Sequence, residues 1–336
     1  MKILVVEWSC AQNETDQEAS LYLDEGKAML EALLEDLVSV GADTMTIARN
    51  GLLRTSIQVE VISPPSGEPF IKTLRHSVSD LTGILIIAPE SNGALLQMTR
   101  DVESLGFRNL GCSADSVALC ADKLCLFSRW RSEKVPTPET WRRLTDIDDS
   151  GPFIVKPRDG CGCVDTVVAE NFSELRILIE KLNRQHATEF IVQKLVRGIP
   201  ASISCIISNE TTVFMPACGQ SIQRIGNRLE YTGGWGPLPE EMITRAQILA
   251  AKALDGIRGL GGWVGVDMIL GDARDGSNDF AIEINPRLTS SYLGIRHMKG
   301  TIAAAAIARR DQIPVGNGND KFRSVVWSKY GKVTAN

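Results

Sequence analysis

Two apolar segments near the C-terminus constrain the fold more than any other part of the chain. They are Val264-Gly-Val-Asp-Met-Ile-Leu270 and Phe280-Ala-Ile-Glu-Ile-Asn-Pro-Arg-Leu288, with a polar stretch from Gly271 to Asn278 between them. This arrangement predicts a β-hairpin. Successive side chains of a strand point to opposite faces. The second strand therefore places Glu283, Asn285 and Arg287 on one face and its apolar side chains on the other.

The side chains of the two strands also predict how they pair. A hairpin that is symmetric about Asp275 pairs Asp267 with Glu283. The apolar pairs in this register are Val266 with Ile284, Met268 with Ile282, and Leu270 with Phe280. A shift by one residue would move every side chain to the wrong face. The polar face gathers Asp267, Glu283 and Asn285, an all-oxygen set that suits a hard cation such as Mg²⁺. This set indicates an enzyme.

Composition and charge exclude several other classes of protein. A chain of 336 residues can form two or three domains with cores of their own. A net charge of −5 without a basic cluster argues against nucleic-acid binding. No apolar run approaches the ~18–20 residues that cross a bilayer, and the apolar N-terminus is too short for a secretory signal. Eight cysteines without a CxxC pair indicate reduced thiols, as expected in the cytoplasm.

Strand and helix patterns alternate through the first 112 residues. Strands are expected at Lys2–Val6, Val59–Ile62 and Gly83–Ala88, and helices at Leu21–Val40 and Gly93–Leu105. Alternation of this kind is typical of a small, mostly parallel sheet with helices on both faces. We therefore expect residues 1–112 to form an N-terminal α/β domain.

The rest of the chain mixes strands and helices without that alternation. Ser113 is expected to cap a helix that runs to Arg131. Single strands are expected at Phe153–Lys156 and Glu189–Val196. A pair of strands is expected at Ala201–Ser208 and Thr212–Cys218, and a peripheral strand at Arg323–Trp327. Further helices are expected at Phe172–Arg184, Pro239–Gly259 and Gly300–Arg310. The stretch from Gly219 to Pro239 shows no periodicity, so we expect a long loop there, and such loops are usually functional.

A second group of residues is suited to phosphate binding. Lys156 ends an apolar strand and is followed by a loop that contains Gly160 and Gly162. Glycines let a loop approach phosphates closely, and a lysine supplies a positive charge. A turn with a solvated lysine would give the same pattern. The segment matches neither the P-loop nor the GxGxxG fingerprint.

Taken together, these features resemble the ATP-grasp superfamily. The residues that carry the resemblance occur in one order: Lys123, Lys156 with its loop, Gln193 to Gly198, Asp267, and Glu283 to Arg287. The resemblance implies an N-terminal α/β (pre-ATP-grasp) domain and two α+β subdomains that hold ATP between them. The implied boundaries are residues 1–112 for the N-terminal domain, 113–195 for the small subdomain with the glycine-rich loop, and 196–336 for the C-terminal subdomain with the metal site.

The resemblance also implies a role for each matching residue. Lys123 and Lys156 would reach the ATP phosphates, with Lys156 and Arg287 acting in catalysis. The remaining ATP contacts would come from Asp159, Gly160, Cys161, Gly162, Gln193, Lys194, Leu195 and Val196. Asp267, Glu283 and Asn285 would bind two Mg²⁺ ions, with Mn²⁺ as an alternative. Pro200 stands where many members have a ribose-binding glutamate, so no ribose contact is assigned.

Flanking segments narrow the resemblance to one group of ligases. Ser20-Leu-x3-Glu25-Gly-x2-Met29-Leu, Gly198-Ile-Pro-Ala-Ser-Ile-Ser204, Gly219-Gln-Ser-Ile-Gln223 and Tyr231-Thr-Gly-Gly-Trp-Gly-Pro237 are similar to the group that includes the tyramine–glutamate ligases of methanofuran biosynthesis. The similarity implies an ADP-forming ligase that joins a small-molecule carboxylate to an amine through an acyl phosphate, with tyramine and L-glutamate as the expected substrates. The expected substrate contacts are Gln220, Tyr231, Ser290 and Ser291.

Several alternatives remain open at this point. An aromatic amine needs an aromatic wall, for which Trp8, Tyr231, Trp235 and Tyr292 are candidates. Arg287 could form a structural ion pair with Glu283, and Lys123 could be a surface lysine. The enzyme could join another acid and amine or be a small-molecule kinase, or the protein could be a nucleotide-binding regulator. Homodimers are common among such ligases, so a homodimer is one expected oligomeric state.

Overall fold

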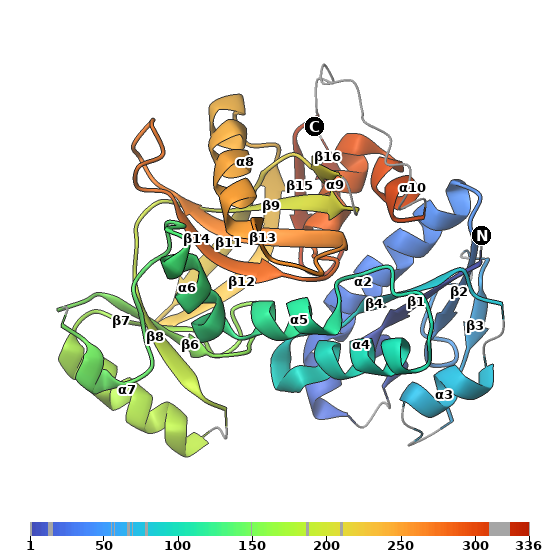
Figure 1. Cartoon of the computed structure of the whole chain (residues 1–336), viewed down its shortest axis with the longest axis horizontal. Coiled ribbons are helices and arrows are strands. Elements are labelled where there is room, and N and C mark those ends of the chain that lie inside the picture. The colour runs from blue at the N-terminus through green and yellow to red at the C-terminus, as the bar shows by residue number, and fades with distance from the viewer. Residues whose placement is uncertain are drawn as a thin grey trace.

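The structure is a computed structural model, and three sets of elements make up its fold. It describes residues 2–12, 16–54, 56, 58–65, 68, 70–77, 80–148, 150–185, 188–208, 211–308 and 323–335. In Figure 1 the N-terminal sheet lies at the right, a small antiparallel group at the lower left, and a large antiparallel set above and between them. No helix among the described residues has the length and apolar content needed to span a membrane.

The N-terminal set is a four-stranded parallel sheet. Its strands are β1 (Lys2–Glu7), β2 (Asp43–Ile47), β3 (Glu60–Ile62) and β4 (Gly83–Ile87), in the order β3-β2-β1-β4. Ile3 and Val5 pack in a core with helix α2 (Gln17–Ser39), whereas Leu4 and Val6 pack with α3 (Phe70–Ser77) and α4 (Ala94–Ser104). The predicted parallel sheet with helices on both faces is therefore confirmed. Strand β2 and the short helix α1 (Trp8–Ala11) were not predicted.

The helix expected from Ser113 to Arg131 is two helices. They are α5 (Ala114–Ala121) and α6 (Lys123–Ser132), and the chain between them is extended at Asp122. Ser113 caps α5 as predicted, its Oγ accepting a hydrogen bond from the Ser116 amide at 3.4 Å. Asp122 caps α6 by accepting from two backbone amides. The break turns Lys123 into the interior, where it is 9% exposed, so the surface-lysine alternative is wrong.

The other two sets of strands join into a second sheet of twelve strands. Its small-subdomain strands are β5 (Thr140–Trp141), β6 (Phe153–Pro157), β7 (Val167–Ala169) and β8 (Phe190–Lys194), which carry α7 (Phe172–Gln185). The larger set comprises β9 (Ile199–Ile207), β10 (Thr212–Phe214), β11 (Cys218–Ile225), β12 (Arg228–Gly236), β13 (Gly262–Leu270) and β14 (Phe280–Asn285). The two sets meet where Arg228 of β12 pairs with Val167 of β7. The subdomain boundary at residues 195 and 196 stays a prediction.

Helices and two late strands complete the fold. They are α8 (Glu240–Leu254), α9 (Ser291–Lys299), α10 (Ile302–Ala308), β15 (Val325–Ser328) and β16 (Val333–Ala335), together with single 3-10 turns at Ser91–Gly93 and Leu144–Asp146. Helix α9 was not predicted. The helix expected to end at Arg310 begins at Ile302 instead of Gly300, and its last two predicted residues lie outside the described residues.

The prediction of a long loop from Gly219 to Pro239 is wrong. Strands β11 and β12 form an antiparallel hairpin there, with a register shift between Ser221 and Ile222. The strand β15, expected to be peripheral, pairs with β12. The glycines of this hairpin hid the side-chain alternation that predicts strands, because glycine stands where space is needed for a large side chain from another segment. A β-carbon at Gly234 or Gly294 would lie within 2.4 Å of the Trp327 ring, so both positions form a slot that holds this ring.

Trp327→Ala is expected to lower the free energy of unfolding by about 3–5 kcal/mol, the range for deleting a large buried aromatic ring. Trp327 is 3% exposed, whereas Val326 on the same strand is 48% exposed. The control, Val326→Ala, is expected to change stability by less than about 0.5 kcal/mol. Urea denaturation of both variants measures the difference. Equal effects of the two substitutions would show that the ring adds nothing to the core.

Candidate active site

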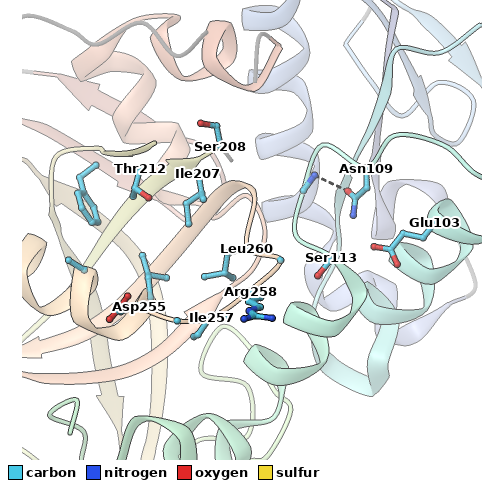
Figure 2. A pocket seen from close by; sticks show the side chains of 16 residues that line it. Glu103, Asn109, Ser113, Ile207, Ser208, Thr212, Asp255, Ile257, Arg258 and Leu260 are labelled. Atoms are coloured by element: carbon cyan, nitrogen blue, oxygen red, sulfur yellow. Dashed lines mark hydrogen bonds between the residues drawn. The ribbon is translucent and has the colours of Figure 1, made fainter. Parts of the chain in front are cut away.

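Residues from all three sets of elements line one cavity of about 520 Å³. Apart from Asp159 and three of the four candidates for an aromatic wall, every residue that the sequence predicted for phosphate, adenine, metal or substrate binding lines this cavity. A larger cavity of about 700 Å³ lies beside Glu103, Ser113 and Arg258 (Figure 2), and none of the predicted site residues is among the described residues that line it. The chemistry predicted from the sequence therefore gathers in the smaller of the two.

The β13–β14 hairpin forms one wall of this cavity. Asp267 pairs with Glu283 and Val266 with Ile284, as predicted. Beyond Asp267 the predicted register is wrong, because a bulge shifts the pairing so that Met268 pairs with Ala281 and Ile269 with Phe280. Ala281 is consequently buried in the core, and Ile282 lines the cavity beside Glu283. Bulges often occur next to active sites, where they redirect a side chain.

The two carboxylates of this wall lie close to two buried lysines. The Nζ atom of Lys123 is 3.4 Å from Glu283 Oε2. Burial raises the pKa of Glu283, but Lys123 and Lys156 outweigh that effect and lower the pKa overall. Burial lowers the pKa of Lys156 to about 8, against the opposing effect of Glu283. Glu283 is therefore the ionised centre of the site and interacts with the charges of both lysines.

Asp267 lacks such compensation. Burial and the charge of Glu283 raise the pKa of Asp267 to about 7. Asn285 donates to Asp267 through Nδ2 at 3.1 Å, which leaves Oδ1 of this amide to bind a cation. A divalent cation would offset the carboxylate repulsion, and all the donors are oxygens, so the residues present fit Mg²⁺. Among the described residues no cluster of three acidic, cysteine or histidine side chains offers another metal site.

The glycine-rich loop after β6 lies against the N-terminal domain. Lys123 Nζ donates to the carbonyl oxygen of Gly160, which ties the loop to α6. Asp159 turns away from the cavity and accepts a hydrogen bond from the Asn92 amide at 3.0 Å. Ser91 Oγ lies 3.9 Å from Cys161 Sγ. Asp159 therefore holds the loop against the turn at Ser91–Gly93 in this structure, and its contact with nucleotide stays a prediction.

The segment expected to bind adenine connects β8 to β9. Gln193 is buried and donates to Thr140 at 2.9 Å. The backbone amide of Leu195 donates to the carbonyl oxygen of Pro152 at 3.0 Å, so this N–H is already used. The carbonyl of Leu195 and the backbone of Val196 remain as the predicted adenine contacts. Pro200 also lines the cavity, in agreement with the absence of an acidic ribose contact at this position.

Arg287 forms its ion pair with a residue that the sequence did not single out. Its Nε and Nη2 atoms donate to the two carboxylate oxygens of Glu90 at 3.0 and 2.9 Å. Glu90 follows β4 in the N-terminal domain and is 4% exposed. The alternative of a structural pair with Glu283 is therefore wrong. A two-point pair fixes the plane of the guanidinium, so Glu90 sets the direction in which Arg287 faces the cavity.

Comparison with known proteins decides the family. A model of the ATP-grasp domain matches residues 120–291, just over half of the chain, and a model of the pre ATP-grasp 3 domain matches residues 43–117. The chain belongs to the ATP-grasp family. The predicted ATP-grasp fold, with its parallel N-terminal sheet, and the prediction of an ADP-forming carbon–nitrogen ligase are thereby confirmed.

Individual relatives agree with this placement. The chain is 25% identical over 298 residues to a tyramine–L-glutamate ligase of Methanocaldococcus fervens, which covers 88% of this chain and 89% of that protein. An ATP-grasp superfamily protein from Archaeoglobus fulgidus shares the fold with a TM-score of 0.72 at 23% identity, covering 97% and 91% of the two chains. An L-amino acid ligase from Bacillus licheniformis gives 0.71 at 16%, covering 97% and 79%.

The predicted substrate contacts of this ATP-grasp chain differ in their accessibility. Tyr231 lines the cavity, and its hydroxyl lies 2.9 Å from Ser290 Oγ. Gln220 interacts with Asp267. Ser291 bonds to Ser204 and Thr289 and is almost fully buried, but it also lines the cavity, so its contact with substrate stays a prediction.

The aromatic residues proposed as a wall for the amine do not lie together. Tyr292 is fully buried and donates to Asp36 at 2.7 Å, so it cannot contact a substrate. Trp235 is 37% exposed, and Trp8 packs edge-on against Tyr22 at 6.3 Å between ring centroids. Neither tryptophan lines the 520 Å³ cavity within the described part of the chain. Tyr231 alone among the four candidates reaches it.

Asp122 positions the first lysine of this ATP-grasp site. Burial raises its pKa, but two hydrogen bonds from Arg158 and the α6 backbone amides outweigh burial and lower the pKa to about 2. The ionised carboxylate therefore stabilises the folded state at pH values above its ordinary pKa of 3.8. This contribution declines as the pH falls from about 4 to about 2, because the carboxylate is protonated in the folded state as well below that range.

Asp122→Asn keeps a good cap but removes this charge. The change in pKa corresponds to at most about 2.5 kcal/mol, and partial exposure reduces it. We expect a loss of about 1–2 kcal/mol in the free energy of unfolding at pH 7 and almost none at pH 2. Urea denaturation of both proteins at pH 7, 4, 3 and 2 measures the difference. A difference that stays constant across this range would exclude the charge as its cause.

Proposed function

We propose that this ATP-grasp enzyme joins a carboxylic acid to an amine through an acyl phosphate, with L-glutamate as the acid and tyramine as the amine. One observation carries the ligase proposal: the cavity places two buried lysines, an acidic oxygen face and a fixed arginine around one space. The substrate pair is supported by the similarity to the tyramine–L-glutamate ligase of Methanocaldococcus fervens over 88% of the chain.

The reaction begins with phosphoryl transfer. A carboxylate oxygen of the acid attacks the γ-phosphorus of ATP, the bond to the bridging oxygen breaks, and ADP leaves. Positioning and charge neutralisation provide most of the catalysis in such a step. Lys123 and Lys156 face the phosphates from α6 and β6 and stabilise the charge that moves onto ADP. Asp267, Glu283 and Asn285 would hold Mg²⁺ ions, which offset phosphate charge when bound.

Amide formation follows at the same carbon. The amine nitrogen attacks the acyl carbon, the bond from carbon to the phosphate oxygen breaks, phosphate leaves, and the nitrogen loses a proton. Arg287 lines the cavity at the end where this carbon would lie. Its guanidinium, held by Glu90, would stabilise the oxyanion of the tetrahedral intermediate and the departing phosphate. Arginine supplies charge but no proton, since it stays protonated in proteins.

No cysteine has to act as a nucleophile in this reaction. Cys161 and Cys163 lie in the glycine-rich loop, where burial raises the pKa of Cys161 to about 11 and that of Cys163 to about 12. Both stay protonated at neutral pH and are poor nucleophiles. The proposed reaction therefore carries the acyl group on phosphate and needs no thioester to either of these two thiols.

The test is a screen of acids crossed with amines in the presence of ATP and Mg²⁺. ADP release is measured for each pair, and products are identified by mass spectrometry. The proposal predicts full ADP release only when an acid and an amine are both present, with one amide formed for each ADP. A stable phosphorylated product without an amide would identify a kinase instead. The absence of ADP release with every pair would refute the ligase proposal.

A further inference from the structure

A second cavity of about 280 Å³ adjoins the ATP-grasp cavity beneath helix α2. The two cavities share Glu25, Tyr231 and Arg287 along their walls, together with Cys161, Gly162 and Val164 of the glycine-rich loop. None of residues 193–198 lines the second cavity within the described part of the chain, so this cavity adjoins the phosphate end of the site, away from the predicted adenine segment. Its volume is just below the usual range for small-molecule sites, which begins at about 300 Å³, so it suits a compact organic molecule.

We infer that this second cavity binds the amine substrate and that Glu25 binds its ammonium group. The inference rests on the proposed ligase function, which requires an amine to reach the acyl carbon from a side that the nucleotide leaves open. Glu25 stands at the junction of the two cavities. An ammonium group bound there would lie next to the end of the cavity that Arg287 occupies, and it would transfer one proton to the Glu25 carboxylate before the neutral nitrogen attacks the acyl carbon.

The charges around the second cavity favour a cation over an anion. Glu7, Asp24 and Glu25 contribute three carboxyl groups to its lining, and Lys329 and Arg287 contribute two cations. Arg287 is already neutralised by Glu90. The remaining cation, Lys329, is outnumbered by the carboxyl groups. An amino acid would place one or two carboxylates next to these carboxyl groups, which would repel it. An amine brings a single positive charge, which they would attract.

Glu25 is the carboxylate best placed to meet this charge. Glu7 is 2% exposed, and its carboxylate already accepts hydrogen bonds from the Ser9 hydroxyl at 2.6 Å and the Cys10 amide at 2.8 Å. Glu25 has no ion pair within the described part of the chain. Burial raises its pKa, while Ser290, Arg287 and Lys329 lower it. Glu25 is partly buried and has the Ser290 hydroxyl as a hydrogen-bond partner, but it lacks an ion pair, which an ammonium ligand would supply.

The residue after Glu25 explains how the helix reaches this position. A β-carbon at Gly26 would lie 2.4 Å from the carboxyl group of Glu7. Glycine therefore lets α2 approach the end of β1 closely, and this approach brings Glu25 to the junction of the two cavities. The pair Glu25-Gly26 acts as one unit, in which the glycine provides the space and the glutamate provides the charge.

The remaining walls are mostly apolar or aromatic. The chain contributes Tyr22, Met29, Ile87, Val164, Tyr231 and Tyr330. Aromatic side chains bind flat, apolar bodies well, and a phenolic hydroxyl on the ligand could bond to a tyrosine. The cavity therefore fits a primary amine that carries a single aromatic ring or an apolar body of similar size.

Glu25→Gln tests the inference with tyramine, L-glutamate and ATP as probes, or with the pair that the substrate screen identifies. We expect KM for the amine to rise at least tenfold, with KM for ATP and for the acid within twofold of the original values. Glu25→Asp should recover part of the loss, because it restores the charge. In tyrosol a hydroxyl replaces the ammonium group, so the original enzyme should bind tyrosol more weakly than tyramine. In Glu25→Gln this preference for tyramine over tyrosol should be smaller.

A matched control is Glu35→Gln, on the same helix but outside both cavities, where Glu35 pairs with Arg54 and Arg296. It should leave all three KM values within twofold. If the original protein releases no ADP with any acid and amine, the proposed function itself fails. If it does turn over, but Glu25→Gln leaves KM for the amine unchanged or raises KM for the acid instead, the inference about this cavity is overturned and the ligase proposal stands.

Discussion

Glu283→Gln is expected to lower kcat by about 10³-fold or more while the protein remains folded. Glu283 lies opposite Asp267 and 3.4 Å from Lys123, so its charge serves both the predicted metal ions and the lysines. Glutamine keeps the size and one oxygen but removes the charge. Loss of one preorganised electrostatic group in an active site costs about 10²–10³ in kcat, and weaker metal binding adds to that loss.

Steady-state ADP release and circular dichroism measure the two parts of this prediction. The control is Asp275→Asn at the exposed tip of the same hairpin, where Asp275 interacts with the nearby Ser277 and accepts from its backbone amide. That variant should retain normal turnover. Survival of activity in Glu283→Gln would show that the assignment of Glu283 to the metal site is wrong.

Arg287→Met is expected to destabilise the fold by about 3–5 kcal/mol and to abolish amide formation. The substitution leaves Glu90 buried without a partner, because this carboxylate is only 4% exposed and bonds to Arg287 at two points. Removal of one partner from a buried ion pair costs about this much, whereas replacement of both partners by apolar residues is often neutral.

The double variant Arg287→Met with Glu90→Leu separates these two effects. It should recover most of the lost stability in urea denaturation but none of the lost turnover, because the guanidinium is needed for the chemistry and not only for folding. A single variant as stable as the original protein would refute the role of the ion pair in the fold. A double variant that regains turnover would refute the catalytic role of Arg287.

The parts of the fold that were predictable are those in which one periodic pattern determines both faces of an element. Strand β1 alternates between two cores through Ile3 and Leu4, and the β13–β14 hairpin has one polar and one apolar face as far as Asp267. The bulge after Asp267 was not predictable, since no glycine or proline marks it. The β11–β12 hairpin was missed because its glycines make room for Trp327, a residue almost 100 positions away.

The residues of the candidate site also fall into those that a local sequence pattern predicted and those that depend on packing between distant segments. Lys156, Asp267 and Glu283 were found because each lies in a short segment whose local pattern suggests its chemistry. Glu90 was missed because its role depends on the N-terminal domain packing against Arg287. Glu25 belongs to a segment already noticed for its similarity to a group of ligases, but its position between two cavities follows only from the packing of α2.

The most direct test of the proposed mechanism follows an oxygen atom. The acid substrate is labelled with ¹⁸O in both oxygens of the reacting carboxylate, and the phosphate released during amide formation is analysed by mass spectrometry. If the reaction passes through an acyl phosphate, the attacking carboxylate oxygen leaves with the phosphate. We predict that each phosphate carries one ¹⁸O atom and that the amide retains the other. Unlabelled phosphate, formed together with the amide, would contradict the acyl-phosphate mechanism.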